Sequence, residues 1–167
     1  MHICIFHTFC IRDRSSHNPT IKHWFSINSV YNNGMHRLRT VGCFMEYEER
    51  FLLLLRQSYK SEGNTWWLPA WKVEPGETDH GAMVREIFEE TWFRVREEEL
   101  EFLGVHTFTF PEYILDFSTF RLRLLETFDV VLDPTAHTAW LFMSRDECIT
   151  REDIIRGLPE LVQEVYE

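Results

Sequence analysis

The chain has 167 residues, of which 44% are apolar and 15% aromatic, a composition that predicts one folded domain with a sizeable core. Lys and Arg number 17 against 27 Asp and Glu, and the net charge of -10 excludes broad electrostatic attraction to nucleic acid or to an anionic membrane. We therefore expect no stable nucleic-acid complex and no membrane association. An anionic small substrate would need a cation bound with it.

The chain carries no strong targeting signal. No stretch approaches the roughly 18 to 20 apolar residues of a transmembrane helix, and the segment MHICIFHTFC lacks a basic leader and a small-residue cleavage site. The cysteines show neither a CxxC pair nor a zinc-binding spacing, which indicates thiols in a reducing compartment: Cys4, Cys10, Cys43 and Cys148. These features predict a soluble, cytoplasmic protein.

The composition changes near residue 34. Residues 1–34 hold His2, His7, His17 and His23 together with the turn-forming stretches SSHNPT and NNG, and they show no sustained periodicity. The irregular spacing of these histidines argues against a metal site. We expect an extension over residues 1–34, or sequence upstream of a start at Met35, and the folded domain over residues 35–167.

The remaining sequence predicts strands, one central helix, more strands and a final helix. Strand patterns occupy residues 41–47, 51–57, 66–68, 101–110 and 113–131, and residues 160–167 have a helical pattern. The central helix is expected over residues 79–91, with Thr78 as its N-cap after the turn at Pro75 and Gly76. This order predicts an α/β domain with a mixed sheet between helices.

The central helix has an acidic face. At about 100° per residue, Glu86, Glu89 and Glu90 fall within an arc of roughly 100°, opposite the apolar side chains of the helix. Carboxylates this close repel one another unless a cation lies among them, and hard oxygen ligands without His or Cys suit Mg²⁺ or Mn²⁺. Taken alone, the stretch REIFEE is more often a solvated helix face, in which Arg85 pairs with Glu89.

The turn before this helix favours a functional site over a solvated helix face. The segment WKVEPGETDHGAMVREIFEETWF resembles the Nudix box of the Nudix hydrolases, whose pattern is G, five residues, E, seven residues and R-E-U-x-E-E-x-G-U, with U a bulky aliphatic residue. The matching positions are Glu77, Arg85, Glu86, Ile87, Glu89 and Glu90, with Phe93 last. Trp71 and Trp92 replace the two glycines. The stretch WWLPA resembles the strand and turn before the box, and the similarity extends over about residues 35–167.

The resemblance implies a Nudix-type α/β/α sandwich that hydrolyses a nucleoside diphosphate linked to another group. It implies that Glu86, Glu89 and Glu90 bind Mg²⁺ or Mn²⁺, with the Ala70 carbonyl as a backbone ligand. It also implies that Arg85 holds Glu77 and the carboxylates in place.

The general base is less narrowly defined, because members of the family differ. Glu86 is the first candidate, and Glu112 or Asp116 is the second. Many members have a glutamate before a histidine later in the chain, whereas Ala136 precedes His137 here. We therefore expect His137 to be a surface or capping residue.

Substrate selection lies outside the box. Strand aromatics are expected mostly in the core, with one of them in reach of a base: Phe108, Phe110, Tyr113, Phe117 and Phe120. A nucleoside triphosphate, an oxidised nucleotide, ADP-ribose and a nucleotide sugar all remain open as substrates, as does the oligomeric state.

Two other classes fit parts of the pattern. The tryptophans at the glycine positions allow a catalytically inactive Nudix-like domain that binds a nucleotide or a protein. An isomerase of isoprenoid diphosphates on the same fold would need an active-site cysteine, but neither Cys43 nor Cys148 lies in such a motif. Because every charged position of the box is intact, we hypothesise that both tryptophan codons are UGA read as glycine in the source.

Overall fold

A computed structural model describes residues 36–167, so the extension expected over residues 1–34 lies outside the described part. The strands are β1 (His36–Tyr47), β2 (Arg50–Arg56), β3 (Trp66–Trp67), β4 (Ala70–Lys72), β5 (Glu101–Thr109), β6 (Tyr113–Arg123) and β7 (His137–Ser144). The helices are α1 (Asp79–Thr91), the 3-10 turn η1 (Glu97–Glu99), α2 (Arg145–Thr150) and α3 (Leu158–Tyr166).

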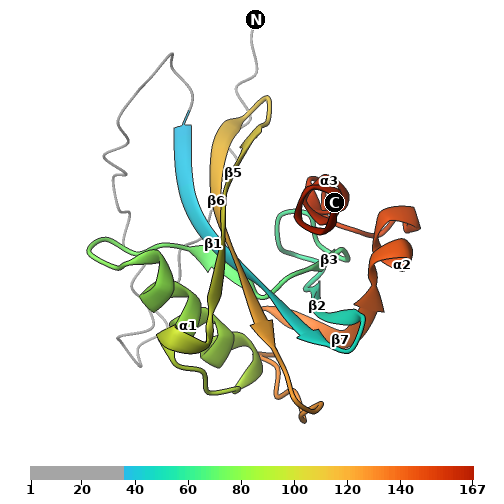
Figure 1. Ribbon diagram of the computed structural model, residues 1–167. Coiled ribbons are helices and arrows are strands. Elements are labelled where there is room, and N and C mark those ends of the chain that lie inside the picture. The colour runs from blue at the N-terminus through green and yellow to red at the C-terminus, as the bar shows by residue number, and fades with distance from the viewer. Residues whose placement is uncertain (1–35) are drawn as a thin grey trace, which may run out of the picture.

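The strands of residues 36–167 form one mixed, seven-stranded sheet. Its main path runs β3-β2-β1-β6-β5, with β4 paired to β1 and β7 paired to β2. The pairing of β1 with β6 is parallel, and the other pairings of named strands are antiparallel. Helix α1 lies on one side of the sheet and helices α2 and α3 on the other (Figure 1). The structure therefore has the predicted α/β/α arrangement.

Alternation along β1 and β2 supplies both halves of the core. Val41, Cys43 and Met45 point toward the α1 side, together with Leu52 and Leu54 of β2. The intervening side chains of these strands pack on the opposite side with α3 and the two tryptophans of β3: Phe44, Phe51 and Leu53. Apolar side chains on both faces of these strands are expected when helices cover both faces of a sheet.

Gly42 allows one aromatic ring to lie directly against β1. A Cβ atom at this position would stand 2.1 Å from the Phe117 ring, closer than any real contact. Phe117 is only 1% exposed and lies beside Trp67, with ring centroids 5.3 Å apart. Gly42 thus leaves room for the Phe117 ring, which forms part of the wall of a pocket.

Most predicted elements are confirmed, with differences at their ends. Helix α1 has the predicted bounds and N-cap. Strand β1 begins at residue 36 instead of 41, because its exposed first half is held by parallel pairing with β6. The strand pattern expected over 113–131 ends at Arg123, and β7 and α2 were not predicted.

No helix formed by residues 36–167 is both long and apolar enough to cross a membrane.

We predict that a shortened chain beginning at Met35 keeps the fold, because residues 36–167 already form the sheet and cover both of its faces. Its melting temperature should lie within a few degrees of that of the full chain, where a change of about 2–4 °C corresponds to roughly 1 kcal/mol. Differential scanning calorimetry of the two chains measures this. A loss of more than about 10 °C would show that the first 34 residues supply part of the core.

Candidate functional site

The start of helix α1 is fixed by a turn that closes on itself. Thr78 caps the helix, its hydroxyl accepting a hydrogen bond from the Gly81 N–H at 3.0 Å. Before it, the Glu77 carboxylate accepts from the Glu74 N–H, also at 3.0 Å. The turn therefore holds the Glu77 side chain in one place relative to the helix axis.

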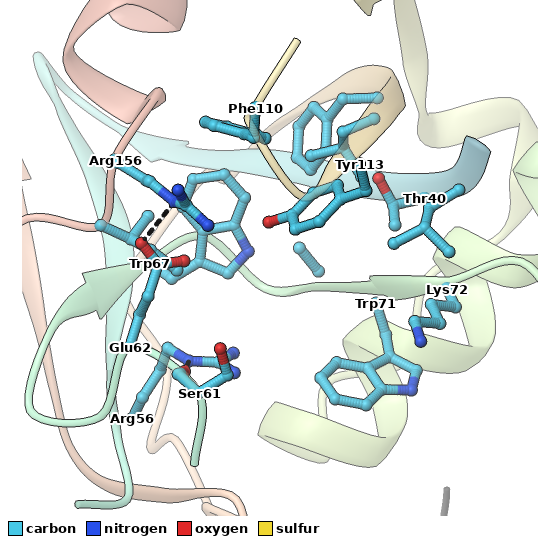
Figure 2. Close-up of a pocket in the computed structure, with 15 residues that line it drawn as sticks. Thr40, Arg56, Ser61, Glu62, Trp67, Trp71, Lys72, Phe110, Tyr113 and Arg156 are labelled. Carbon is cyan, nitrogen blue, oxygen red and sulfur yellow. Dashed lines mark hydrogen bonds and ion pairs between the residues drawn. The ribbon is translucent and has the colours of Figure 1, made fainter. Parts of the chain in front are cut away.

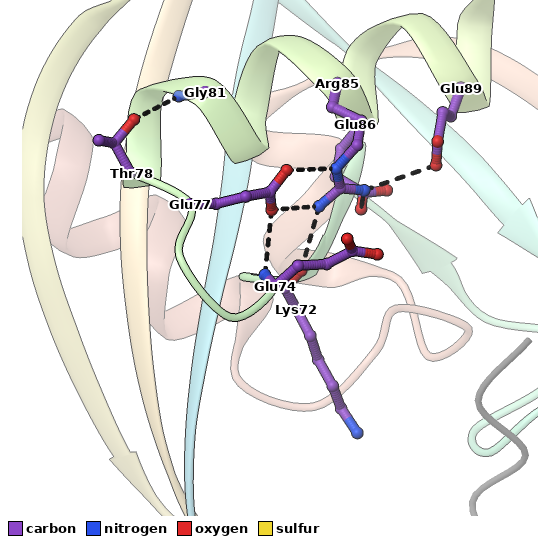
Figure 3. A network of polar contacts seen from close by, with 8 residues as sticks. All are labelled: Lys72, Glu74, Glu77, Thr78, Gly81, Arg85, Glu86 and Glu89. Carbon is purple, nitrogen blue, oxygen red and sulfur yellow. Dashed lines mark hydrogen bonds and ion pairs between the residues drawn. The ribbon is translucent and has the colours of Figure 1, made fainter. Parts of the chain in front are cut away.

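Arg85 grips that carboxylate with two parallel hydrogen bonds (Figure 3). Arg85 Nε donates to Glu77 Oε1 at 2.7 Å and Nη2 donates to Oε2 at 2.8 Å. The guanidinium beside Glu77 holds the pKa of that carboxyl below its usual range. Nη2 also donates to the Lys72 carbonyl at 3.5 Å, so Arg85 ties the helix both to the turn and to the end of β4. Such a planar, bidentate contact is one that lysine could not reproduce.

The same guanidinium faces two of the predicted metal ligands. Arg85 Nη1 donates to Glu86 Oε1 and lies 3.5 Å from Glu89 Oε2. Glu90 is held differently, since its Oε2 accepts a hydrogen bond from the Ala70 N–H at 3.0 Å. The structure thus gathers Glu77, Glu86 and Glu89 around Arg85 and places Glu90 against the Ala70 N–H.

The expectation that the whole acidic array faces away from the core is wrong. Glu86 is 3% exposed and Glu90 is 5% exposed, whereas Glu89 keeps more solvent contact. The physical reason is that α1 packs against β1 and β4, which cover the helix side that carries Glu86 and Glu90. A solvated acidic face is therefore excluded as an account of these two residues, because buried carboxylates are stable only when they are paired or bound.

The donor set suits a hard divalent cation. Within residues 36–167, no group of three or more Asp, Glu, His or Cys side chains is already arranged around a common point as a metal site. Arg85 contacts Glu86 and Glu89, and the Ala70 N–H fixes Glu90. Neighbouring carboxylates on one helix that share a single guanidinium still fit Mg²⁺ or Mn²⁺ chemically, provided that the Glu86 side chain leaves Arg85.

A pocket lies beside this helix face (Figure 2). Its walls come from strands β1, β2, β3, β4 and β6, the loop between β2 and β3, the turn before β6, and the loop between α2 and α3. Its aromatic lining is Trp67, Trp71, Phe110, Tyr113 and Phe117. Three of the five strand aromatics singled out in the sequence thus reach the pocket. Phe120 is buried beside His80 instead, and Phe108 packs against the α3 side of the core.

The charged side chains in the pocket are mainly cationic. Among the described residues that line it, the cations are Arg56, Lys72 and Arg156, and the single carboxylate is that of Glu62. Burial lowers the pKa of Arg56 and of Lys72 from their usual values. An anionic ligand would stabilise the charged forms of these two side chains, which burial disfavours. Sequence reasoning did not find Arg56 or Arg156, because neither lies in a motif.

The two alternative base candidates occupy different surroundings. Asp116 accepts hydrogen bonds from Arg37 Nη2 at 2.7 Å and from Thr107 at 2.9 Å, and the Arg37 contact lowers the pKa of this carboxyl. Glu112 contacts Arg156 at 3.4 Å, at the edge of the pocket. The contacts of both are with side chains other than Glu86, Glu89 and Glu90.

The expectation for His137 is wrong, because this residue is buried. Its side chain is 3% exposed, and its Nε2 lies 3.8 Å from Glu90 Oε1. Burial and the nearby Arg56 charge lower the pKa of His137 to about 4, so the imidazole is neutral near pH 7. The position was misjudged because β7, which carries it against β2, was not predicted from the sequence.

The cysteines within the described residues are core thiols. Cys43 and Cys148 are both fully buried, and burial raises the pKa of Cys148 to about 12. Neither thiol is among the residues that line the pocket. This arrangement gives no support to an isomerase with an active-site cysteine.

The two tryptophans at glycine positions differ in their backbone conformation. Trp92 caps the C-terminus of α1 in the left-handed region, with φ 59° and ψ 12°, and its side chain is 63% exposed. Trp71 has no positive φ and lies in β4, where it pairs with Val41 of β1. Its indole lines the pocket, with Lys60 Nζ 5.7 Å from the ring centroid. Only Trp92 stands where glycine is favoured on conformational grounds.

Comparison with known proteins identifies the family. A model of the NUDIX domain matches residues 36–162, and the chain therefore belongs to the NUDIX family. Among solved structures, it is similar to the MutT protein from Methanosarcina mazei Go1, with a TM-score of 0.70 at 21% identity over 80% of this chain and 96% of that one.

Two other solved structures show the same fold. For a MutT NUDIX hydrolase from Burkholderia pseudomallei the TM-score is 0.67 at 19% identity, covering 79% of this chain and 99% of that one. For an Ap4A hydrolase from C. elegans the TM-score is 0.55 at 21% identity, covering 76% and 93%. The predicted Nudix fold is thereby confirmed.

We predict that Trp92→Gly is more stable than Trp92→Ala by about 1 kcal/mol, because both variants lose the indole but only glycine adopts a positive φ without cost. Urea unfolding of the two variants compares them directly, and their difference cancels the lost contact between Trp92 and Phe88. Equal stabilities, or a more stable alanine variant, would contradict the conformational account.

We also predict UGA at the codons for residues 71 and 92, since every charged position of the box is kept while both glycine positions hold tryptophan. Sequencing the gene and the source's glycine tRNAs tests this. UGG at both codons would contradict it and would favour the inactive binding domain.

Proposed function

We propose that this chain hydrolyses a nucleoside diphosphate linked to another group, using Mg²⁺ or Mn²⁺ held on helix α1. The observation that carries the proposal is the pair of buried carboxylates, Glu86 and Glu90, beside a cationic, aromatic pocket. Carboxylates gathered on one helix offer oxygen ligands to a divalent cation, and a pocket of this character suits an anionic ligand with a ring system.

Glu86, Glu89 and Glu90 would hold the ion, with the Ala70 carbonyl as a backbone ligand. When bound there, the ion supplies Lewis-acid polarisation of the diphosphate oxygens and acidifies a water molecule for attack on phosphorus. Arg85 is a positioning residue in this scheme. Its bidentate contact with Glu77 keeps it in place while its Nη1 releases Glu86.

Glu86 is our first candidate for the general base, because its carboxylate lies at the buried end of the array. Glu112 is the second, since it lies at the pocket edge beside Arg156. Asp116 is less suited, because Arg37 and Thr107 hold both of its oxygens and favour its ionised form.

A catalytically inactive binding domain is the second candidate function. It is favoured by Trp71, whose indole lines the pocket where a smaller residue would leave room for a ligand. This domain would bind a nucleotide or a protein without releasing product, whereas the first candidate releases product.

The deciding experiment incubates the full chain and its Trp71→Gly variant with a panel of nucleoside triphosphates, nucleotide sugars and ADP-ribose, with Mg²⁺ or with EDTA. Chromatography of the products should show cleavage of the diphosphate with Mg²⁺ only. Nucleotide binding without cleavage in either protein would leave the inactive domain as the better account.

We predict that Glu90→Gln weakens Mn²⁺ binding at least about tenfold and lowers turnover about a hundredfold or more, because a neutral amide loses several kcal/mol of charge stabilisation. The fold should persist, since the amide oxygen can still accept from the Ala70 N–H. Isothermal titration with Mn²⁺ and steady-state rates provide the measurement.

The matched control for this variant is Glu98→Gln, a carboxylate on η1 that is two-thirds exposed. It should bind Mn²⁺ and turn over as the unmodified chain does. Unchanged Mn²⁺ binding in Glu90→Gln would exclude Glu90 as a ligand.

A further inference from the structure

Arg156 lies at one end of the pocket and contacts two segments that are distant from it in sequence. Its guanidinium lies 4.3 Å from the Phe110 ring centroid and 5.8 Å from that of Tyr113. Its Nε forms an ion pair with Glu62 Oε1 at 2.9 Å, across the pocket wall (Figure 2). The aromatic faces fix the plane of the guanidinium, and the carboxylate occupies one of its edges.

Figure 2 shows Arg156 and Glu62 at the end of the pocket opposite Trp71 and Lys72. Lys72 belongs to β4, the strand that Arg85 and Glu90 connect to helix α1. The pocket therefore has two cationic ends. One adjoins the carboxylate helix, and the other, at Arg156, lies away from it.

Glu62 is the one acidic side chain among the described residues that line the pocket. It lies near Arg56 and Arg156 (Figure 2), and its backbone has a positive φ of 51°, which a non-glycine residue adopts at some cost. The free space in the pocket is about 110 Å³, well below the roughly 300 Å³ or more of ordinary ligand sites. Because Glu62 Oε1 already pairs with Arg156 Nε, a ligand group that takes this edge of the guanidinium must move the Glu62 side chain.

We propose that Arg156 is a specificity-determining residue that binds a phosphate group of the ligand, and that Glu62 is an internal anion which that phosphate displaces. The inference rests on the proposed function, because it assigns the ligand a phosphate group at the pocket end away from helix α1. A guanidinium fixed by ring stacking matches phosphate oxygens bidentately, and the exchange of one anion for another leaves Arg156 compensated in both states.

Neutralising Glu62 should change ligand binding in opposite directions, depending on whether Glu62 competes with the phosphate or only forms a structural ion pair. If the ion pair only ties the loop at Glu62 to the loop at Arg156, neutralising either partner should weaken ligand binding or leave it unchanged. If Glu62 competes with the ligand, neutralising Glu62 should strengthen the binding of a phosphate compound.

The experiment is isothermal titration of the full chain with sodium pyrophosphate in EDTA, so that no metal contributes. Glu62→Gln should bind pyrophosphate roughly three- to tenfold more tightly than the unmodified chain, and Arg156→Gln should bind it more weakly than the unmodified chain by a similar factor. Glu112→Gln is the matched control. It also removes one negative charge that contacts Arg156, at 3.4 Å, but Glu112 is not among the residues that line the pocket.

Unchanged or weaker pyrophosphate binding by Glu62→Gln would overturn the proposal, as would equal tightening by Glu112→Gln or undetectable binding by Glu62→Gln. Melting temperatures of the variants exclude unfolding as the cause, and Glu62→Gln decides the question even if Arg156→Gln fails to fold. Because the titration is free of metal and turnover, its outcome is separate from that of the hydrolysis panel. If the chain cleaves a nucleotide but Glu62→Gln does not bind pyrophosphate more tightly, only this inference is refuted. If Glu62→Gln binds pyrophosphate more tightly but the chain cleaves nothing, only the proposed activity is refuted.

Discussion

The structure depends on the burial of two carboxylates on a helix that also carries a third. Glu86 and Glu90 are almost fully removed from solvent, and acids in such surroundings must be compensated. Arg85 compensates Glu86, and the Ala70 N–H compensates Glu90. Arg85 can do so only because the turn before the helix presents Glu77 to it at two hydrogen-bonding distances. The hydrogen bonds of the Nudix box thus stabilise negative charge inside the folded protein.

Strand β4 connects the Nudix box to the pocket, although it has only three residues, Ala70–Lys72. Its first residue donates to Glu90, and its last residue accepts from Arg85 through the backbone. All three residues also line the pocket. Two side chains of α1 thus hold the main chain of this part of the pocket wall, one on each side of Trp71.

The Nudix box could be predicted from the sequence because its pattern lies in one continuous stretch of residues. The bounds of α1 and the Thr78 cap follow from spacing along one turn and one helix, and the resemblance to the Nudix box implied the contact of Arg85 with Glu77. Burial of Glu86 and Glu90 could not be predicted in this way. It depends on β1 and β4 covering the helix, and helical periodicity alone assigned those positions to solvent.

The elements that were missed share a dependence on distant partners. The first half of β1 is exposed, and its pairing with β6 joins residues far apart in the chain. Strand β7, which buries His137, pairs with β2 across a similar separation. Arg156 reaches the pocket from a loop with no motif, so only the folded chain brings it to Phe110 and Glu62.

The central claim is that the carboxylates of α1 bind a divalent cation after Glu86 leaves Arg85. Crystals grown with Mn²⁺ and a non-hydrolysable nucleoside diphosphate analogue test it through anomalous scattering. The account predicts an anomalous peak bounded by the carboxylates of Glu86, Glu89 and Glu90, with Arg85 still paired to Glu77 but withdrawn from Glu86. A map with no peak on α1, in which Arg85 keeps its contacts with both Glu77 and Glu86, would contradict it.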